Sequence, residues 1–222
     1  MILNGFIDHT LLKPTTLVAD IKNLCAEAIQ YSFAAVCVPP PFVKIAKAML
    51  DQTSVKVATV IGFPFGYSCV EAKLAESLLT IVDGADELDI VINFTAIKNN
   101  DWDFVANEIN HLLPVIKAQN KIVKVIIESG VLTNQEIIQC CTLYGAAGID
   151  YLKTSTGYAP KGADVETVVL MRKHLPPNVQ IKASGGIKTY HFAVALVKAG
   201  ASRLGCSAGV AIVNQQTAND GY

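Results

Sequence analysis

Residues 121–148 read KIVKVIIESGVLTNQEIIQCCTLYGAAG, and this stretch decides the fold class. Its first part, VKVII at 123–127, is almost uniformly apolar, as is typical of a parallel strand covered on both faces. Its second part repeats apolar residues at helical spacing from Ile137 to Leu143, and we expect that helix to end at Gly145. The stretch therefore predicts one strand–helix unit of an α/β protein.

The same order of short apolar run, turn and amphipathic segment occurs eight times along the chain. Eight strand–helix units in a chain of this length predict a single α/β domain over residues 1–222, folded as a (β/α)8 TIM barrel. The alternative is a doubly wound open sheet, whose nucleotide-binding version is disfavoured because no GxGxxG follows an early strand. We expect the polar residues 214–222 to form a mobile tail. The expected strands are Phe6–Thr10, Ala34–Val38, Lys56–Ile61, Glu87–Ile92, Val123–Ile127, Tyr151–Thr154, Gln180–Ala183 and Arg203–Cys206.

The composition excludes several classes of protein. The 222 residues carry 18 Lys and Arg against 19 Asp and Glu, and 51% of them are hydrophobic, which rules out a disordered chain. The near-neutral charge argues against broad binding to nucleic acid or to a membrane surface, and the apolar stretches are too short to span a bilayer. Six cysteines without a CxxC motif or a signal peptide predict reduced thiols and a cytoplasmic protein, and no cysteine or histidine has the spacing of a metal site.

Two lysines end neighbouring predicted strands. Lys153 ends the run before Thr154, and Lys182 ends the next run, before a Ser-Gly-Gly turn. Functional groups of a barrel lie at the C-terminal ends of its strands, so both ammonium groups are expected in the barrel mouth. Burial and a second cation both lower the pKa of a lysine, and a free amine can attack a carbonyl. The simpler interpretation is that each lysine extends from its strand end into solvent.

Carboxylates add a second group of candidates. Asp89 lies inside the apolar stretch 87–92, where it must be paired, and beside a lysine it could hold the positive charge or relay a proton. A structural salt bridge is the alternative role. Asp8 and Glu128 are weaker candidates, and we expect Glu87 to be solvated.

Glycine-rich turns follow the last two predicted strands. Gly185 and Gly186 follow the seventh, and a Gly-Cys-Ser-Ala-Gly segment containing Ser207 follows the eighth. Loops at these two positions of a barrel commonly bind phosphate through backbone N–H groups, although a Gly-Gly pair is more often only a turn. The four histidines show no partner spacing, and surface positions are expected for His111 and His191.

These segments together resemble the deoxyribose-phosphate aldolases, a family of class I (Schiff-base) aldolases. The similarity covers nearly the whole chain, and the most specific segments are KTSTG at 153–157 and KASGG at 182–186. It implies reversible cleavage of 2-deoxy-D-ribose 5-phosphate to D-glyceraldehyde 3-phosphate and acetaldehyde. No metal or cofactor is needed, because an iminium serves as the electron sink. A homo-oligomer, as dimer or tetramer, is compatible with apolar helix faces.

The resemblance also assigns roles to residues. It implies that Lys153 forms the Schiff base, that Lys182 lowers the pKa of Lys153, and that Asp89 shuttles protons. It places the substrate phosphate on Gly185, Gly186 and Ser207, and it gives a terminal tyrosine, here Tyr222, a part in proton exchange at the enamine carbon.

The chain departs from the family pattern at two positions. Ala208 stands where many members have a second serine, and Tyr158 stands where some have a lysine, so weaker phosphate binding is expected. Two other functions remain open at this point. One is a sugar-phosphate isomerase or epimerase whose lysines only neutralise charge, and the other is a sugar-phosphate-binding protein without catalysis.

Overall fold

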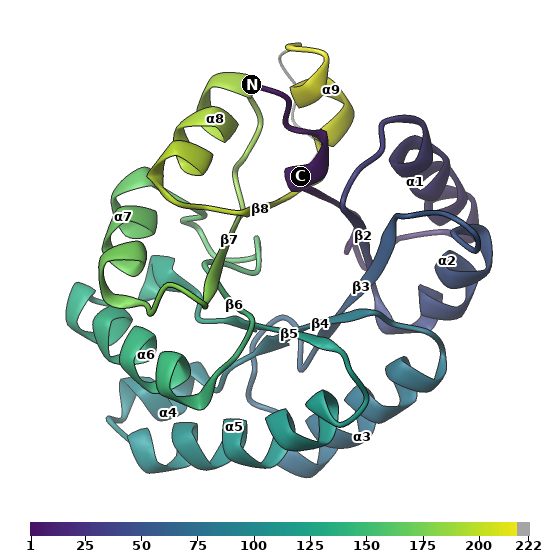
Figure 1. Cartoon of the computed structure of the whole chain (residues 1–222). Helices are drawn as coiled ribbons and strands as arrows, with labels where there is room; N and C mark the ends of the chain where they lie inside the picture. Colours follow the sequence, from purple (N-terminus) through teal and green to yellow (C-terminus); the bar gives the residue numbers. More distant parts are fainter. Residues whose placement is uncertain (217–222) are drawn as a thin grey trace.

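The computed structural model describes residues 1–216, and Figure 1 shows its strands enclosed by a ring of helices. Eight parallel strands close into a barrel in the order β1-β2-β3-β4-β5-β6-β7-β8, so the prediction of a (β/α)8 barrel is confirmed. Each strand pairs with the next along the chain, and β1 pairs with β8 to close the ring. The strands are β1 Ile7–Thr10, β2 Ala35–Val38, β3 Lys56–Ile61, β4 Glu87–Val91, β5 Ile122–Ile126, β6 Tyr151–Lys153, β7 Gln180–Ser184 and β8 Arg203–Cys206.

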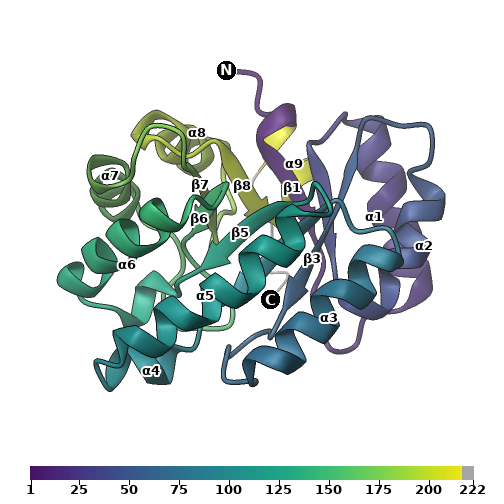
Figure 2. The same ribbon diagram turned by 60° about the horizontal axis from the view of Figure 1, so that its bottom comes forward.

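The helices pack along the outside of the strands, as Figure 2 shows from the side. The main hydrophobic core lies between the two layers, and it includes Ile21 of α1, Leu112 of α5 and Leu196 of α8. No helix within residues 1–216 is long and apolar enough to cross a membrane. The helices are α1 Val18–Gln30, α2 Val43–Met49, α3 Val70–Val82, α4 Phe94–Lys98, α5 Trp102–Lys117, α6 Asn134–Ala147, α7 Val165–His174, α8 Tyr190–Ala199 and α9 Gly209–Val213, with 3₁₀ turns η1 Asn4–Phe6, η2 Pro40–Phe42 and η3 Ser129–Val131.

Helix α6 shows how local sequence sets the boundaries of an element. Thr133 accepts a hydrogen bond from the N–H of Glu136, and the Glu136 carboxylate accepts one from the N–H of Thr133, which together form a capping box. The helix continues past Gly145 to Ala147 and is capped by Gly148, so the predicted end was wrong. Gly148 has the left-handed backbone, with φ of +80°, that a C-terminal cap needs, and Gly145 has a helical one.

The interior of the barrel is divided between apolar and charged side chains. A small apolar cluster of Leu12, Ala35, Cys37, Ala58 and Val60 comes from the β1–β3 side, with Phe63 packed against it. Charged side chains from β1 and from β4 to β8 occupy the other side of the interior. Because parallel strands put alternate residues on one face, residues at every second position meet inside the barrel.

Candidate active site

A cluster of seven charged side chains fills one side of the barrel interior. We call it the interior charge cluster. Six of its members are at most 2% exposed, and the seventh, Arg203, is half-buried. Its members are Asp8 of β1, Glu87 and Asp89 of β4, Lys124 of β5, Lys153 of β6, Lys182 of β7 and Arg203 of β8.

Asp89 is the centre of the cluster. Its Oδ2 lies 2.7 Å from the Nζ of Lys153 and 2.7 Å from the Nζ of Lys182, and its Oδ1 accepts a hydrogen bond of 2.8 Å from Lys124. The strand register explains this meeting, because Lys153 pairs with Lys182 across β6 and β7, and Asp89 pairs with Lys124 across β4 and β5. One carboxylate therefore connects the two lysines predicted to carry the chemistry.

Two further carboxylates hold the remaining cations. Asp8 Oδ2 lies 2.5 Å from Lys182 Nζ, and its Oδ1 lies 2.5 Å from Arg203 Nη1. Glu87 lies 2.6 Å from Lys124 and 3.0 Å from the other guanidinium nitrogen of Arg203. Lys124 and Lys182 are thus each shared between at least two carboxylates, whereas the ion pairs of the described residues link Lys153 only to Asp89.

Because the two lysines have different partners, their pKa values are shifted in opposite directions. Burial lowers the pKa of Lys153, and the nearby charge of Lys182 lowers it further against the opposing effect of Asp89. Burial also acts to lower the pKa of Lys182, but Asp8 and Asp89 outweigh it and hold that pKa well above its usual range. Lys182 is therefore the cation of the pair in the resting site, and Lys153 is the amine that loses its proton more readily.

The charge count of the cluster leads to the same conclusion. Burial would raise the pKa of Asp89, but Lys124, Lys153 and Lys182 hold it well below its usual range. Burial acts similarly on Asp8, whose pKa is lowered to about 2 by Lys182 and Arg203. The cluster then holds three carboxylates against the three cations Lys124, Lys182 and Arg203, and it is neutral when Lys153 is a free amine. A buried site disfavours an uncompensated charge, which favours the neutral amine at Lys153.

Lys153 is open to a pocket of about 230 Å³ at the C-terminal end of the strands. The turn after β7 and the segment after β8 contribute Gly185, Gly186 and Ser207 to the same pocket. Both glycines have a left-handed backbone, with φ of +85° and +75°, which other residues adopt only with strain. The pocket therefore brings a buried amine and two glycine-containing loops to one space of the size of a small metabolite.

Comparisons with known proteins agree with this geometry. Residues 4–215 match the DeoC/LacD family aldolase. The chain belongs to this aldolase family. It is 49% identical over 211 residues to the deoxyribose-phosphate aldolase of Caldicellulosiruptor saccharolyticus, covering 95% of this chain and 96% of the relative. It is 46% identical to that of Streptococcus suis over the full length of both chains.

A solved aldolase structure supports the same assignment. The deoxyribose phosphate aldolase from Aeropyrum pernix, described as a tetramer, superposes with a TM-score of 0.89 at 33% sequence identity. The match covers 96% of this chain and 89% of that one. The resemblance inferred from the sequence is therefore confirmed.

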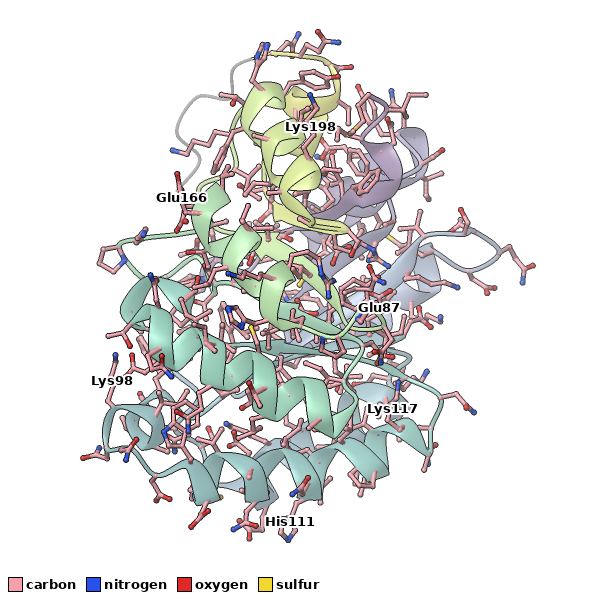
Figure 3. The ribbon with its side chains drawn as sticks, turned by 60° about the vertical axis from the view of Figure 1, so that its left-hand side comes forward. Glu87, Lys98, His111, Lys117, Glu166 and Lys198 are labelled. Atoms are coloured by element: carbon pink, nitrogen blue, oxygen red, sulfur yellow. The ribbon has the colours of Figure 1, made fainter. Side chains whose placement is uncertain are left out.

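The structure brings most of the predicted site residues of this aldolase together. Lys153, Lys182 and Asp89 are in direct contact, and the two glycines and Ser207 line the pocket beside Lys153. Tyr222 lies outside the described residues. Both histidines predicted at the surface, His111 and His191, are exposed, and His111 projects from α5 at the margin of the molecule in Figure 3.

The expectation for Glu87 was wrong. Its side chain is buried inside the barrel, within the outline of the ribbon in Figure 3, and it holds Lys124 and Arg203. Glu87 and Asp89 are two residues apart on β4, so their side chains point to the same face of the strand.

Sequence reasoning missed Lys124 and Arg203 as members of the cluster. Lys124 stands alone in an apolar run, which is the same signal that identified Asp89. Arg203 begins β8, where the pairing with Lys182 across β7 and β8 places it against the cluster.

Proposed function

We propose that this protein cleaves 2-deoxy-D-ribose 5-phosphate reversibly to D-glyceraldehyde 3-phosphate and acetaldehyde through a Schiff base on Lys153. The observation that carries the proposal is the asymmetry between the two lysines around Asp89. Lys182 is held charged by two carboxylates, while Lys153 faces the pocket and is the lysine with the lowered pKa. This arrangement favours the free, nucleophilic amine of Lys153.

In the first step, the free amine of Lys153 attacks the aldehyde carbon C1 of the open-chain sugar. The carbinolamine that forms loses water, which needs one proton on the departing oxygen, and leaves a protonated imine. The Lys182 ammonium contacts the same carboxylate oxygen as Lys153, so it is placed to donate that proton, which leaves Lys182 as a neutral amine until the next step. The positive imine nitrogen takes the place of the Lys153 ammonium beside Asp89.

In the second step, the C3 hydroxyl gives up its proton while the bond between C2 and C3 breaks. The bonding electrons move into the imine and form a neutral enamine on Lys153, and C3 becomes the aldehyde carbon of D-glyceraldehyde 3-phosphate. This proton passes through Asp89 to the neutral Lys182 amine and restores its ammonium group, since Asp89 Oδ2 lies 2.7 Å from the Nζ atoms of both lysines. The contacts of Asp89 with Lys124, Lys153 and Lys182 hold its carboxylate in this position.

In the last step, a proton is returned to C2 of the enamine, and water hydrolyses the imine to release acetaldehyde. Tyr222 is proposed to assist this proton exchange, on the strength of the family resemblance. We assign the substrate phosphate to the pocket end formed by Gly185, Gly186 and Ser207, because backbone N–H groups in glycine turns can approach an anion closely. Neither Ala208 nor Tyr158 is a member of the interior charge cluster.

Two further features complete the proposal. All six cysteines are free, which suits the reducing environment of the cytoplasm.

We propose a homo-oligomer, since the relative from Aeropyrum pernix is described as a tetramer and α3 exposes Leu79 at 67% and Val82 at 83%. Light scattering on the purified protein measures the number of copies, and a monomer at all concentrations would contradict this assignment.

An assay of the products tests the proposed reaction. Incubation with 2-deoxy-D-ribose 5-phosphate should release equal amounts of D-glyceraldehyde 3-phosphate and acetaldehyde, each measured with a coupled dehydrogenase. An isomerase or epimerase would change the sugar phosphate without releasing acetaldehyde, and a binding protein would leave it unchanged. The variant Lys153→Ala should release neither product while keeping the circular dichroism spectrum of the parent.

A further inference from the structure

Glu128 is a buried carboxylate near the proposed nucleophile that the mechanism above does not use. It lies two residues after the end of β5, is 3% exposed, and has a left-handed backbone with φ of +49°. That conformation is uncommon for a residue other than glycine and is retained when surrounding contacts fix it. The backbone conformation of Glu128 is therefore maintained by its contacts, and those contacts indicate its role.

Within residues 1–216, both hydrogen bonds to the Glu128 side chain come from Thr156. The N–H of Thr156 donates to Glu128 Oε2 over 3.2 Å, and the Thr156 hydroxyl donates to the same oxygen in a short contact. The other oxygen, Oε1, is buried without a hydrogen-bond partner among the described residues. Glu128 thus acts on the loop after β6 through a single oxygen.

This contact continues across the mouth of the barrel. The Thr156 hydroxyl accepts a hydrogen bond of 3.0 Å from the N–H of Tyr158, and the Tyr158 hydroxyl donates one of 2.9 Å to the carbonyl of Leu12. Thr156, Tyr158 and Leu12 all line the pocket. Glu128 therefore lies at the start of a chain of hydrogen bonds that ties together the loops after β5, β6 and β1.

The fixed loop also packs against the proposed phosphate end of the pocket. The Cα of Gly157 lies 3.5 Å from the position that a Cβ on Gly185 would occupy. A shift of the loop would therefore change the space beside Gly185, while Lys153 is held separately by β6 and by Asp89.

We propose that Glu128 is a positioning residue that fixes the segment 156–158 as the pocket wall beside the phosphate end, and so determines the affinity for the phosphorylated substrate. The proposal rests on the proposed function, because it concerns the substrate of that reaction. It requires the two hydrogen bonds at Oε2 and does not require the negative charge. Burial raises the pKa of Glu128, and a proton on Oε1 would leave both bonds at Oε2 intact.

The matched variants Glu128→Gln and Glu128→Ala separate the hydrogen bonds from the charge. The amide oxygen of glutamine can accept both hydrogen bonds from Thr156, with its NH₂ group at the position of Oε1. We expect E128Q to keep the KM of the parent within about twofold. E128A loses both bonds and should raise KM for 2-deoxy-D-ribose 5-phosphate on the order of tenfold or more, with a smaller change in kcat.

A second readout distinguishes positioning from general damage to the fold. Borohydride trapping of the imine with acetaldehyde alone needs Lys153 but no phosphate end, and its rate in E128A should match that of the parent. The wild-type enzyme, assayed in parallel, tests the proposed function itself. If the wild-type enzyme neither traps the imine nor cleaves the substrate, the proposed function is refuted, and the role of Glu128 is not what failed. Loss of trapping in folded E128A would overturn the proposed role.

The KM values of the variants give three further ways to refute the proposal. An unchanged KM in E128A, or a KM in E128Q raised as much as in E128A, would overturn it. If E128A does not fold, Thr156→Val tests the same hydroxyl contact and should raise KM in the same direction. An unchanged KM in T156V would then overturn the proposal.

Discussion

Removal of the Lys182 charge should shift the pH dependence of the reaction toward alkaline pH. The substitution Lys182→Met keeps a long unbranched side chain and removes the ammonium group that faces Asp8 and Asp89. Two effects then act on Lys153 in the same direction. The repulsion from the neighbouring cation disappears, and Asp89 has one fewer competing partner, so the pKa of Lys153 rises.

The size of the effect follows from the geometry. Both Nζ atoms lie 2.7 Å from the same oxygen of Asp89, so they are roughly 5 Å apart or less. Two unit charges at that separation interact with about 3 kcal/mol at an effective dielectric constant of about 20. This energy corresponds to a factor of about 100 in the fraction of free amine below the pKa.

The assay is the rate of aldol cleavage measured from pH 5 to pH 10. The rate depends on free amine, so it rises with pH through the pKa of Lys153, and a higher pKa moves this rise to higher pH. K182M should therefore be strongly impaired at pH 7 and recover part of its activity at pH 9 to 10. Lys182 also carries a proposed proton-transfer role, so recovery should remain incomplete.

The variant Lys182→Arg serves as the control, because it keeps a positive charge at the same strand position. Its pH profile should rise at a lower pH than that of K182M. Circular dichroism and the melting temperature confirm that each variant is folded. A K182M profile that matches the parent in position and height would refute the reasoning and remove Lys182 from the mechanism.

Three more predictions follow from the same cluster and from the chain end. Asp89→Asn should lower turnover by about 10²–10⁴-fold in the folded fraction, whereas a loss of stability with normal turnover would support a structural salt bridge. Asp8 has a pKa lowered to about 2, so its contribution of roughly 2 kcal/mol is present above pH 4 and is lost as the pH falls toward 2. Urea midpoints at pH 6 and pH 3 should therefore differ less in Asp8→Asn than in the parent. Deletion of Tyr222 should slow proton exchange into acetaldehyde more than imine formation, and an unchanged exchange rate would make the residue dispensable.

The sequence was sufficient to predict the barrel and to single out Lys153, Lys182 and Asp89 as candidates for the reaction. Uniformly apolar runs such as VKVII indicated parallel strands, and the strand boundaries were predicted within one residue at each end. Lys153 and Lys182 were identified because a lysine at the end of a buried strand requires an explanation. The closed ring of strands places these two lysines at paired positions on β6 and β7.

The sequence was not sufficient for the second group of charges in the barrel. Glu87 begins its strand, and a charge at a strand end is usually solvated, so its burial depended on Lys124 and Arg203 from distant segments. Those partners meet only when β4, β5 and β8 face one interior. The two hydrogen bonds from Thr156 to Glu128 likewise depend on how two loops pack together, and no local sequence pattern predicts that packing.

Borohydride reduction in the presence of 2-deoxy-D-ribose 5-phosphate, followed by peptide mass mapping, tests the central claim most directly. Only an imine is reduced to a stable secondary amine, so the added mass marks the lysine that forms it. We expect a single modified site, Lys153, with Lys182 and Lys124 unmodified. Modification at either of those two lysines, or no modification of an enzyme that cleaves the substrate, would contradict the account.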